Sequence, residues 1–308
     1  MKAAVIDVGS NSIKLLVAEK ARDGSLSEVL SRTIEARISM GIGSRQPQLS
    51  PEGISRGVAA VTQLESEARR TGTKKVCAVA TSAVRDASNG ADFTRKLAAE
   101  AGLKLRILSG EEEANLIGRG LRADPGLVGL RNFHAYDLGG GSLECLAFRD
   151  RAIERVASLP LGCVRLTEMF VRSPESPLRE EAAYEIGLHV KALLLKSGFP
   201  LPVPAAFGVV GTGGTFTTIR AMVAKNRGMN LEETHPLIGV AILHEILARV
   251  APMDLAARKA IAGLAPERAD VFPTALVTLL ALAELGAIQA FHHSMRNLRW
   301  GVAAELLG

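Results

Sequence analysis

The chain has 308 residues, of which 47% are hydrophobic and 22% charged, and its formal net charge is +5. This composition excludes a disordered chain, and the length allows two domains that each bury a core. Its cysteines, Cys77, Cys145 and Cys163, are odd in number and far apart. This pattern supports neither a disulfide framework nor a structural zinc site, and it favours a reducing, cytoplasmic location. The positive charge favours an anionic ligand, whereas the sequence lacks the aromatic-interleaved basic runs of nucleic-acid modules.

Two segments bear on targeting and membrane insertion. Residues Lys2–Asp7 predict an apolar strand at the start of the chain, not the apolar region of a signal peptide. The segment from Val271 to Phe291 has Glu284 as its only charged residue and approaches the length of a membrane span. Because Glu284 lies in its middle and Pro273 near its start, we expect a buried core helix there.

Two segments that lie 130 residues apart repeat one pattern. The first, Asp7–Leu16, is DVGSNSIKLL, and the second, Asp137–Leu146, is DLGGGSLECL. The aspartate, the first glycine and the serine coincide, and the apolar positions match. Each segment predicts a strand, a tight turn of small residues and a second strand. The offset has the size of a domain, so we infer two domains of common design that arose by duplication.

The elements that follow the first hairpin predict its fold class. We expect a strand within 25–38, a helix from the N-cap Ser50 to Gly72, a strand at 76–81, a helix at 90–101, a strand at 105–108 and a helix from Ser109. Three sequential strands followed by alternating helices and strands form a mixed sheet covered by helices, which is the ribonuclease-H-like α/β topology.

The second half begins in the same way and then becomes more helical. We expect helices at 177–197, 237–250 and 273–291, and a strand at 206–210 that leads into a glycine-rich turn. Pro125, Gly126 and Gly129 interrupt the pattern between the halves. The predicted domains are therefore 1–126 and 127–308, the second with additional helices, and a cleft is expected between them.

Three turns of small residues follow the apolar strands. Glycine lets backbone N–H groups approach phosphate oxygens, and the third turn also begins a helix whose dipole favours anions. A single turn of this kind is often purely structural, but three in one chain predict phosphate binding. The candidate residues are Gly9, Ser10, Asn11, Ser12, Gly139, Gly140, Gly141, Ser142, Gly211, Thr212, Gly213, Gly214 and Thr215.

Three acidic residues near these turns are candidate metal ligands. The GxxxxGK[ST] pattern of a P-loop is missing from the sequence, so carboxylates must hold any metal. Asp7 and Asp137 end apolar strands, where they bind a cation or cap the N–H groups of the turn. Glu144 faces either the same site or solvent. Hard oxygen ligands beside phosphates predict Mg²⁺, with Mn²⁺ and a monovalent cation as further candidates.

Two further positions have both a structural and a catalytic interpretation. In Ser109-Gly110-Glu111-Glu112-Glu113 the first and fourth residues have the capping-box spacing, whereas repulsion among three acids would raise a pKa toward that of a general base. Arg85 follows a strand end, where it clamps a phosphate or forms a surface ion pair with Asp86.

With these residues assigned, the sequence resembles the exopolyphosphatase/guanosine pentaphosphate phosphohydrolase (Ppx/GppA) family, within the actin-like and sugar-kinase-like superfold. The resemblance covers essentially the whole chain and is carried by IDVGSNSIKLLVAE, ATSAVRDA, SGEEEANLI, DLGGGSLE, LPLGCVRLTE, VVGTGGTFTT and IAGLAPERADVFP. It implies that Glu113 activates the attacking water, that Arg85 lies near the scissile phosphate, and that Asp137, Gly139, Ser142 and Glu144 form the second phosphate loop with its metal-associated acids.

The resemblance predicts Mg²⁺-dependent removal of the terminal phosphate from inorganic polyphosphate. Leu143 stands where the family usually has threonine, and the extra helical domains of long members are missing, so short polyphosphate chains are expected as substrates. The alternatives are hydrolysis of the 5′-phosphate of guanosine pentaphosphate, an ATP-dependent kinase, and a non-catalytic anion sensor. The apolar end 291–307 packs internally or forms a dimer contact; a homodimer is expected because related architectures often associate.

Overall fold

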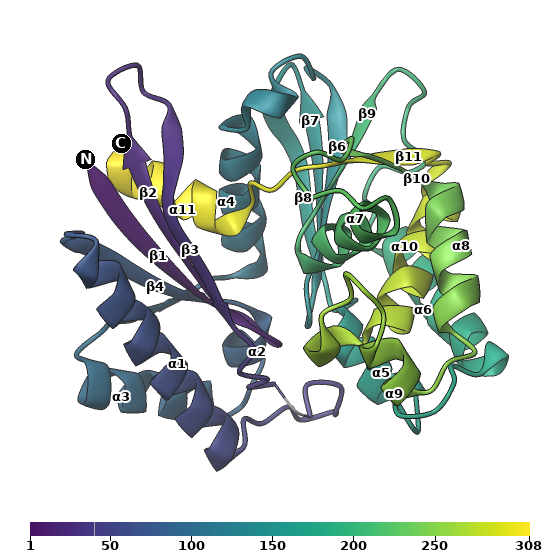
Figure 1. Ribbon diagram of the computed structural model, residues 1–308, viewed down its shortest axis with the longest axis horizontal. Helices are drawn as coiled ribbons and strands as arrows, with labels where there is room; N and C mark the ends of the chain where they lie inside the picture. The colour runs from purple at the N-terminus through teal and green to yellow at the C-terminus, as the bar shows by residue number, and fades with distance from the viewer. Residues whose placement is uncertain (40) are drawn as a thin grey trace. The chain divides into compact units, whose positions relative to one another are not determined.

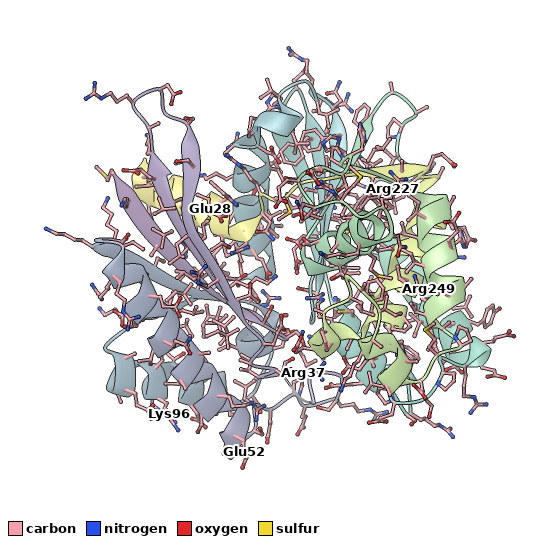
Figure 2. All side chains as sticks on the ribbon, viewed as in Figure 1. Glu28, Arg37, Glu52, Lys96, Arg227 and Arg249 are labelled. Carbon is pink, nitrogen blue, oxygen red and sulfur yellow. The ribbon has the colours of Figure 1, made fainter. Side chains whose placement is uncertain are left out.

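The computed structural model describes residues 1–39 and 41–308, which form two compact units. The first unit contains Met1–Val128 and Arg296–Gly308, and the second contains Gly129–Met295. Each is built on a mixed β-sheet covered by helices (Figure 1). Charged side chains such as Glu52, Arg227 and Arg249 are exposed at the surface (Figure 2).

The sheet of the first unit has the strand order β3-β2-β1-β4-β5. Its strands are β1 (Lys2–Val8), β2 (Ile13–Lys20), β3 (Leu26–Ile34), β4 (Lys75–Ala80) and β5 (Leu105–Ile107). β1 pairs antiparallel with β2 and parallel with β4, so the predicted hairpin and the mixed sheet are both present. The helices are α1 (Pro51–Arg70), α2 (Ser82–Arg85), α3 (Gly90–Ala101), α4 (Gly110–Arg122), η1 (Pro125–Leu127) and α11 (Leu298–Leu307).

Local side-chain chemistry fixes where two of these helices begin. Ser50 caps α1 because its side chain accepts a hydrogen bond of 3.0 Å from the Gly53 N–H. At α4 the Ser109 hydroxyl accepts from the Glu112 N–H, and the Glu112 carboxylate accepts from the Ser109 N–H. Both helix starts confirm the predictions, because capping depends only on residues within one turn.

The expected domain 127–308 is wrong at its C-terminal end, because α11 belongs to the first unit. This helix packs on α4 and β1. Gly301 lies so close to α4 that a Cβ on it would be 1.7 Å from the carbonyl oxygen of Leu116, and Val302 and Ala303 are fully buried. Of the two alternatives expected for the apolar chain end, internal packing is therefore the one that α11 adopts.

The sheet of the second unit has the order β10-β11-β9-β6-β7-β8. Its strands are β6 (Phe133–Leu138), β7 (Leu143–Arg149), β8 (Ala152–Leu159), β9 (Gly208–Thr212), β10 (Leu237–Gly239) and β11 (Ala290–His293). Read from β8 to β11, the strands repeat the order of the first unit, and β10 is added at the edge. Each unit thus has the ribonuclease-H-like sheet predicted from the duplicated hairpins, and together they form the two-domain actin-like ATPase fold that the Ppx/GppA resemblance implied.

Helices bury the core of the second unit against this sheet. They are α5 (Cys163–Phe170), α6 (Glu180–Lys196), α7 (Gly214–Asn226), α8 (Val240–Val250), α9 (Leu255–Lys259), η2 (Pro266–Arg268) and α10 (Phe272–Gly286). Two predicted helices were too long. Leu237–Gly239 pairs with β11 before α8 begins, and α10 ends at Ala287, which adopts the left-handed conformation with φ 53°.

The apolar segment that includes α10 is a core helix, as expected. α10 has 15 residues, and Leu276, Leu279 and Leu282 along it are fully buried. Within residues 1–39 and 41–308, no helix combines the length and apolarity needed to cross a membrane.

Candidate active site

The first predicted phosphate loop, Gly9–Ser12, joins β1 to β2 as a tight turn. The Gly9 N–H donates to the Ser12 carbonyl at 3.2 Å. The Ser10 hydroxyl lies 3.3 Å from the Ser82 hydroxyl, and the Asn11 amide donates to the Glu35 carboxylate at 2.9 Å. The buried side chains of Ser10 and Asn11 therefore hold the loop in place.

The second loop, Gly139–Ser142, repeats this turn between β6 and β7. The Gly139 N–H donates to the Ser142 carbonyl at 3.0 Å. A similar backbone bond thus closes both loops, which agrees with their common pattern. In the second loop, however, the three glycines leave the backbone without side chains on the approach to a ligand.

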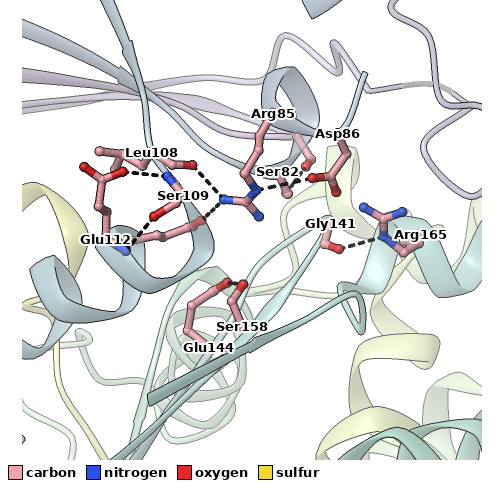
Figure 3. A network of polar contacts seen from close by, with 12 residues as sticks. Ser82, Arg85, Asp86, Leu108, Ser109, Glu112, Gly141, Glu144, Ser158 and Arg165 are labelled. Carbon is pink, nitrogen blue, oxygen red and sulfur yellow. Dashed lines mark hydrogen bonds and ion pairs between the residues drawn. The ribbon is translucent and has the colours of Figure 1, made fainter. Parts of the chain in front are cut away.

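Helix α5 fixes the direction of the peptide groups in the second loop. The N–H of Cys163 donates to the Gly139 carbonyl at 3.0 Å, and the N–H of Val164 donates to the Gly140 carbonyl at 2.8 Å. Arg165 donates its Nε to the Gly141 carbonyl at 2.8 Å (Figure 3). Because the C=O and N–H of a trans peptide point in opposite directions, the next N–H groups along the loop point away from α5. The loop is thereby arranged as a row of donors, as an anion site requires.

This contact depends on a glycine at the start of α5. A Cβ on Gly162 would lie 2.3 Å from backbone atoms of both Gly140 and Gly141, so only glycine permits the approach. Gly162 and the buried Arg165 are residues that sequence reasoning missed. They lie in the LPLGCVRLTE segment, where the pattern Gly-x-x-Arg after a strand was the available signal.

The two predicted acids of the second unit lie side by side. Asp137 on β6 and Glu144 on β7 are direct cross-strand partners, 8% and 1% exposed. The Ser158 hydroxyl donates to Glu144 at 2.8 Å (Figure 3). Like charges directly opposite on a sheet repel, and burial increases the cost. A bound divalent cation would offset both penalties, so the chemistry of this acid pair fits Mg²⁺.

The third predicted acid has a different environment. Asp7 has Lys14 as its cross-strand partner. Its Oδ1 is buried without a hydrogen bond, and burial raises the pKa of Asp7, an effect that Lys14 and Arg299 partly oppose. The described residues contain no group of three His, Cys, Asp or Glu side chains able to hold a metal. Mg²⁺ is commonly bound by one or two carboxylates, with water and phosphates as the other ligands.

The third glycine-rich turn is shorter than expected. Gly211 and Thr212 end strand β9, and a Cβ on Gly211 would meet the Phe216 ring at 2.4 Å, so this glycine serves packing. Gly213 adopts φ 96°, and a Cβ there would lie 2.3 Å from the Asp137 carboxylate. The turn thus lies directly against Asp137, at the start of α7.

The start of α7 also has buried polar groups around it. The hydroxyls of Thr212 and Thr215 are buried without hydrogen-bond partners. A Cβ on Gly214 would lie 2.5 Å from an Arg268 guanidinium nitrogen, so Arg268 packs against this helix N-terminus. Sequence reasoning noted its LAPERADV segment but assigned Arg268 no role. A cation, two hydroxyls and a helix N-terminus together suit an anion.

The two predicted catalytic residues of the first unit form an ion pair. Arg85 Nη1 donates to Glu113 Oε2 at 2.7 Å, and Glu113 is only 6% exposed. Arg85 also bonds the Leu108 carbonyl at 3.1 Å and Asp86 at 3.2 Å (Figure 3). The ion pair with Asp86 is therefore confirmed, and the same guanidinium also holds the buried Glu113, whereas the phosphate-clamp role of Arg85 stays a prediction.

A neighbouring acid on α4, Glu112, follows the capping-box interpretation. The N–H and hydroxyl of Ser109 lower the pKa of Glu112, which is therefore a capping residue. The raised pKa expected for a general base in this cluster is therefore not found at Glu112. Of the three acids, Glu113 is the one buried against Arg85.

Comparison with known proteins identifies the family. The model of the Ppx/GppA phosphatase family matches residues 16–308. The chain belongs to this family. The exopolyphosphatase 2 of Mycobacterium tuberculosis is 31% identical, and the match covers 100% of this chain and 99% of that protein. The Ppx/GppA resemblance predicted from the motifs is thus confirmed.

Solved Ppx/GppA structures share the fold. An exopolyphosphatase from Cytophaga hutchinsonii superposes with a TM-score of 0.88 at 23% identity, over 100% of this chain and 98% of that one. The PPX-GPPA enzyme of Aquifex aeolicus gives a TM-score of 0.78 at 26% identity, over 99% of each chain. The described backbone is therefore that of a Ppx/GppA protein throughout.

Within each unit, this Ppx/GppA chain brings together some of the predicted residues. In the first unit Glu113 contacts Arg85, while Ser10 and Asn11 support their own loop. In the second unit Asp137, Glu144 and the turn at Gly213 are neighbours. The cleft expected between the two units stays a prediction, as do the catalytic and metal-binding roles of these residues.

Proposed function

We propose that the chain is an exopolyphosphatase, which hydrolyses the terminal phosphoanhydride bond of inorganic polyphosphate. The observation that carries the proposal is the buried Glu113 carboxylate, held by Arg85 at 2.7 Å. A buried, oriented carboxylate is what in-line attack by water requires of its general base. Membership of the Ppx/GppA family and the name of the mycobacterial relative support the same substrate.

The residues of the chain divide the reaction between them. Glu113 accepts a proton from water, whose oxygen attacks the terminal phosphorus, and the bond from phosphorus to the bridging oxygen breaks. Arg85 keeps the carboxylate in place, and its five N–H donors allow it also to contact an equatorial oxygen. The N–H groups that follow Gly139 bind the phosphate oxygens. The products are orthophosphate and a polyphosphate shorter by one residue.

We further propose that Asp137 and Glu144 hold Mg²⁺, with Asp7 as an additional predicted ligand and Mn²⁺ or a monovalent cation as substitutes. The buried acid pair on β6 and β7 supports this. When bound, the ion supplies positive charge against the phosphate oxygens. A cytoplasmic location is proposed as well, since Cys77, Cys145 and Cys163 are free thiols.

The test compares Glu113→Gln with Glu111→Gln, an exposed acid in the same helical turn. Phosphate release is measured from polyphosphates of defined length, guanosine pentaphosphate and ATP, with Mg²⁺ and with EDTA. We expect Glu113→Gln to lower kcat about 10²- to 10⁴-fold with KM nearly unchanged, and Glu111→Gln to behave as wild type. Wild-type turnover by the Glu113→Gln variant removes Glu113 from the mechanism.

The choice of substrate has its own outcome. Release from guanosine pentaphosphate alone would assign the chain to its nearest rival function, and release from ATP with transfer to an acceptor would indicate a kinase. The expected preference for short polyphosphates stays a prediction, which the series of chain lengths measures directly.

A further inference from the structure

A buried histidine and a buried arginine of the second unit lie outside the groups assigned to hydrolysis. His293 on β11 is 3% exposed and Arg220 on α7 is 7% exposed. Because β11 pairs in parallel with β9, His293 is level with Gly211, just before the turn that begins α7. Burying ionisable groups is costly unless their polar atoms have partners, so the contacts of these two side chains indicate what they do.

Arg220 is held by backbone and hydroxyl groups and contacts the histidine with its remaining end. Its Nη2 donates to the carbonyls of Leu231 and Thr234 at 2.7 and 2.8 Å, and its Nε donates to the Thr234 hydroxyl at 3.2 Å. Its Nη1 lies 3.2 Å from Nδ1 of His293. A guanidinium has five N–H donors and no acceptor, so Nδ1 of the histidine accepts this hydrogen bond.

This hydrogen bond fixes the tautomer of His293. An imidazole whose Nδ1 accepts is neutral and carries its proton on Nε2. Burial, with the Arg220 cation as the next cause, lowers the pKa of His293 to about 3, so the ring stays neutral at physiological pH. The Nε2–H then donates to the Thr217 hydroxyl, 3.4 Å away.

Thr217 connects the histidine to the third glycine-rich turn. Its hydroxyl oxygen accepts from His293, and its own proton is donated to the Gly213 carbonyl at 3.1 Å. The Thr217 N–H donates to the same carbonyl at 3.2 Å. Gly213 has φ 96°, and glycine exchanges such a conformation for others at little cost. The side-chain bond therefore restrains the most flexible point of the turn.

The orientation of Gly213 matters because the turn lies in the candidate site. A Cβ on Gly213 would lie 2.3 Å from the Asp137 carboxylate. The N–H of Gly214 points opposite to the Gly213 carbonyl and is one of the first donors of α7, which have no partner inside the helix. The hydroxyls of Thr212 and Thr215 in the same turn are buried without hydrogen-bond partners.

We propose that Arg220, His293 and Thr217 form a positioning network, which holds the Gly213–Gly214 peptide so that its N–H faces a phosphate oxygen of the substrate. The three side chains act through the backbone of the turn and do not touch the substrate. The effect of the network on rate rests on the proposed function, whereas the order of donors and acceptors within it is independent of the reaction.

The first experiment reads the tautomer of His293 by proton–nitrogen correlation NMR of the full-length protein at neutral pH, with His293→Gln used to assign its signals. We expect a proton on Nε2 and none on Nδ1. A ring with a proton on Nδ1 overturns the proposal, because it cannot accept from Arg220. This outcome is the same whichever substrate the enzyme uses.

The second experiment breaks the network at two of its hydrogen bonds. Thr217→Val keeps the shape of the side chain and removes the hydroxyl. His293→Asn keeps an acceptor for Arg220 but is too short to reach Thr217. Each variant should lower kcat/KM for polyphosphate about 3- to 10-fold, as expected for one neutral hydrogen bond, and the double variant should lose no more than either single one. His293→Gln restores a donor near the Nε2 position and should recover most of the activity.

The matched control is Thr278→Val on α10. The Thr278 hydroxyl is fully buried and makes the same kind of bond one turn back, to the Thr274 carbonyl at 2.9 Å. This variant should lose thermal stability as Thr217→Val does and should leave kcat/KM unchanged. Equal losses of kcat/KM in the two valine variants, or additive losses in the double variant, overturn the proposal.

A binding measurement separates the network from the proposed function. The Kd of tripolyphosphate is measured by calorimetry in the Glu113→Gln background, where turnover is not needed. Thr217→Val should raise this Kd by the factor seen in kcat/KM, and Thr278→Val should not. A wild type that binds tripolyphosphate without hydrolysing polyphosphate refutes the proposed function alone, whereas an unchanged Kd in Thr217→Val refutes the network.

Discussion

Arg165 lies outside the reacting groups, yet we expect its loss to lower activity through the second loop. Its Nε donates to the Gly141 carbonyl at 2.8 Å, and this bond helps to turn the following N–H toward a bound anion. The substitution Arg165→Met keeps much of the side-chain volume and removes the donor.

The size of the effect follows from the kind of bond. A hydrogen bond to a charged donor contributes about 1.5–3 kcal/mol. If the orientation of the loop matters only when phosphate is bound, losing this hydrogen bond weakens the stabilisation of the transition state by the same free energy. We then expect kcat/KM for polyphosphate to fall about 10- to 150-fold, with Arg165→Lys intermediate because its single ammonium lacks the guanidinium fork.

A matched control separates positioning from plain destabilisation. Arg151 lies in the turn between β7 and β8, at the far end of β7 from Gly139–Ser142. Its Nη1 donates a hydrogen bond of 3.2 Å to the Leu130 carbonyl. Arg151→Met should therefore cost stability without changing kcat/KM. Both variants are assayed for initial rates and thermal unfolding, well below their melting temperatures.

The reasoning is refuted if Arg165→Met melts at a lower temperature but retains the wild-type kcat/KM. That result would make Arg165 a purely structural residue of α5. Equal losses of kcat/KM in Arg165→Met and Arg151→Met would likewise show that the effect is not specific to the loop.

Three further predictions concern stability. Gly301→Ala places a methyl group 1.7 Å from the Leu116 carbonyl oxygen and should destabilise the first unit by about 1–3 kcal/mol in urea unfolding. The control Gly239→Ala, whose Cβ meets nothing within 4 Å, should leave the free energy of unfolding unchanged. Equal effects of the two substitutions would contradict the close contact between α11 and α4. Burial raises the folded-state pKa of Asp7 above 3.8, so its contribution to stability is lost as pH rises through that raised pKa. Asp7→Asn in metal-free buffer should therefore gain stability over wild type as pH increases from 3.8, and a constant difference would argue against it. Burial, with the nearby Arg220 cation, lowers the pKa of His293 from 6.5 to about 3. The stability that the neutral imidazole contributes is therefore present above pH 6.5 and is lost as the pH falls toward 3, at about 1.4 kcal/mol per pH unit. His293→Gln should show a shallower acid loss between about pH 6.5 and 4, and a parallel pH profile would mean that His293 does not titrate on unfolding.

Much of the fold was predictable because its signals are local. The cap at Ser50 and the capping box at Ser109 involve residues within one helical turn. The hairpins at Asp7 and Asp137 follow from apolar runs on both sides of small residues. Elements of this kind are specified by neighbours in sequence, so one sequence suffices to find them.

Elements that depend on distant partners were missed. The strand β10 has only three residues, Leu237–Gly239, too few for an alternating pattern, and its pairing partner β11 lies more than 50 residues later in the chain. The membership of α11 in the first unit rests on Gly301 meeting Leu116. Composition and periodicity carry no information about such pairs, because they describe each segment alone.

The candidate site divides in the same way. Glu113, Arg85, Asp137 and Glu144 were found because motifs mark their positions. Arg165 acts on a carbonyl 24 residues earlier, and only the structure shows that contact. A residue that orients backbone leaves a weak trace in a sequence, since its partner is a carbonyl that every residue has.

The duplicated hairpins differ at one position that bears on the roles proposed for the two units. Both close their loop with a similar glycine-to-serine bond, and both place an aspartate before it. The residue across the strand differs, because Asp7 faces Lys14, whereas Asp137 faces Glu144. Lys14 partly offsets the buried charge of Asp7, whereas two acids side by side are the arrangement for which we propose a bound cation. This one cross-strand position is why we propose the metal site for the second hairpin, and it leaves the proposed base, Glu113 on α4, in the other unit.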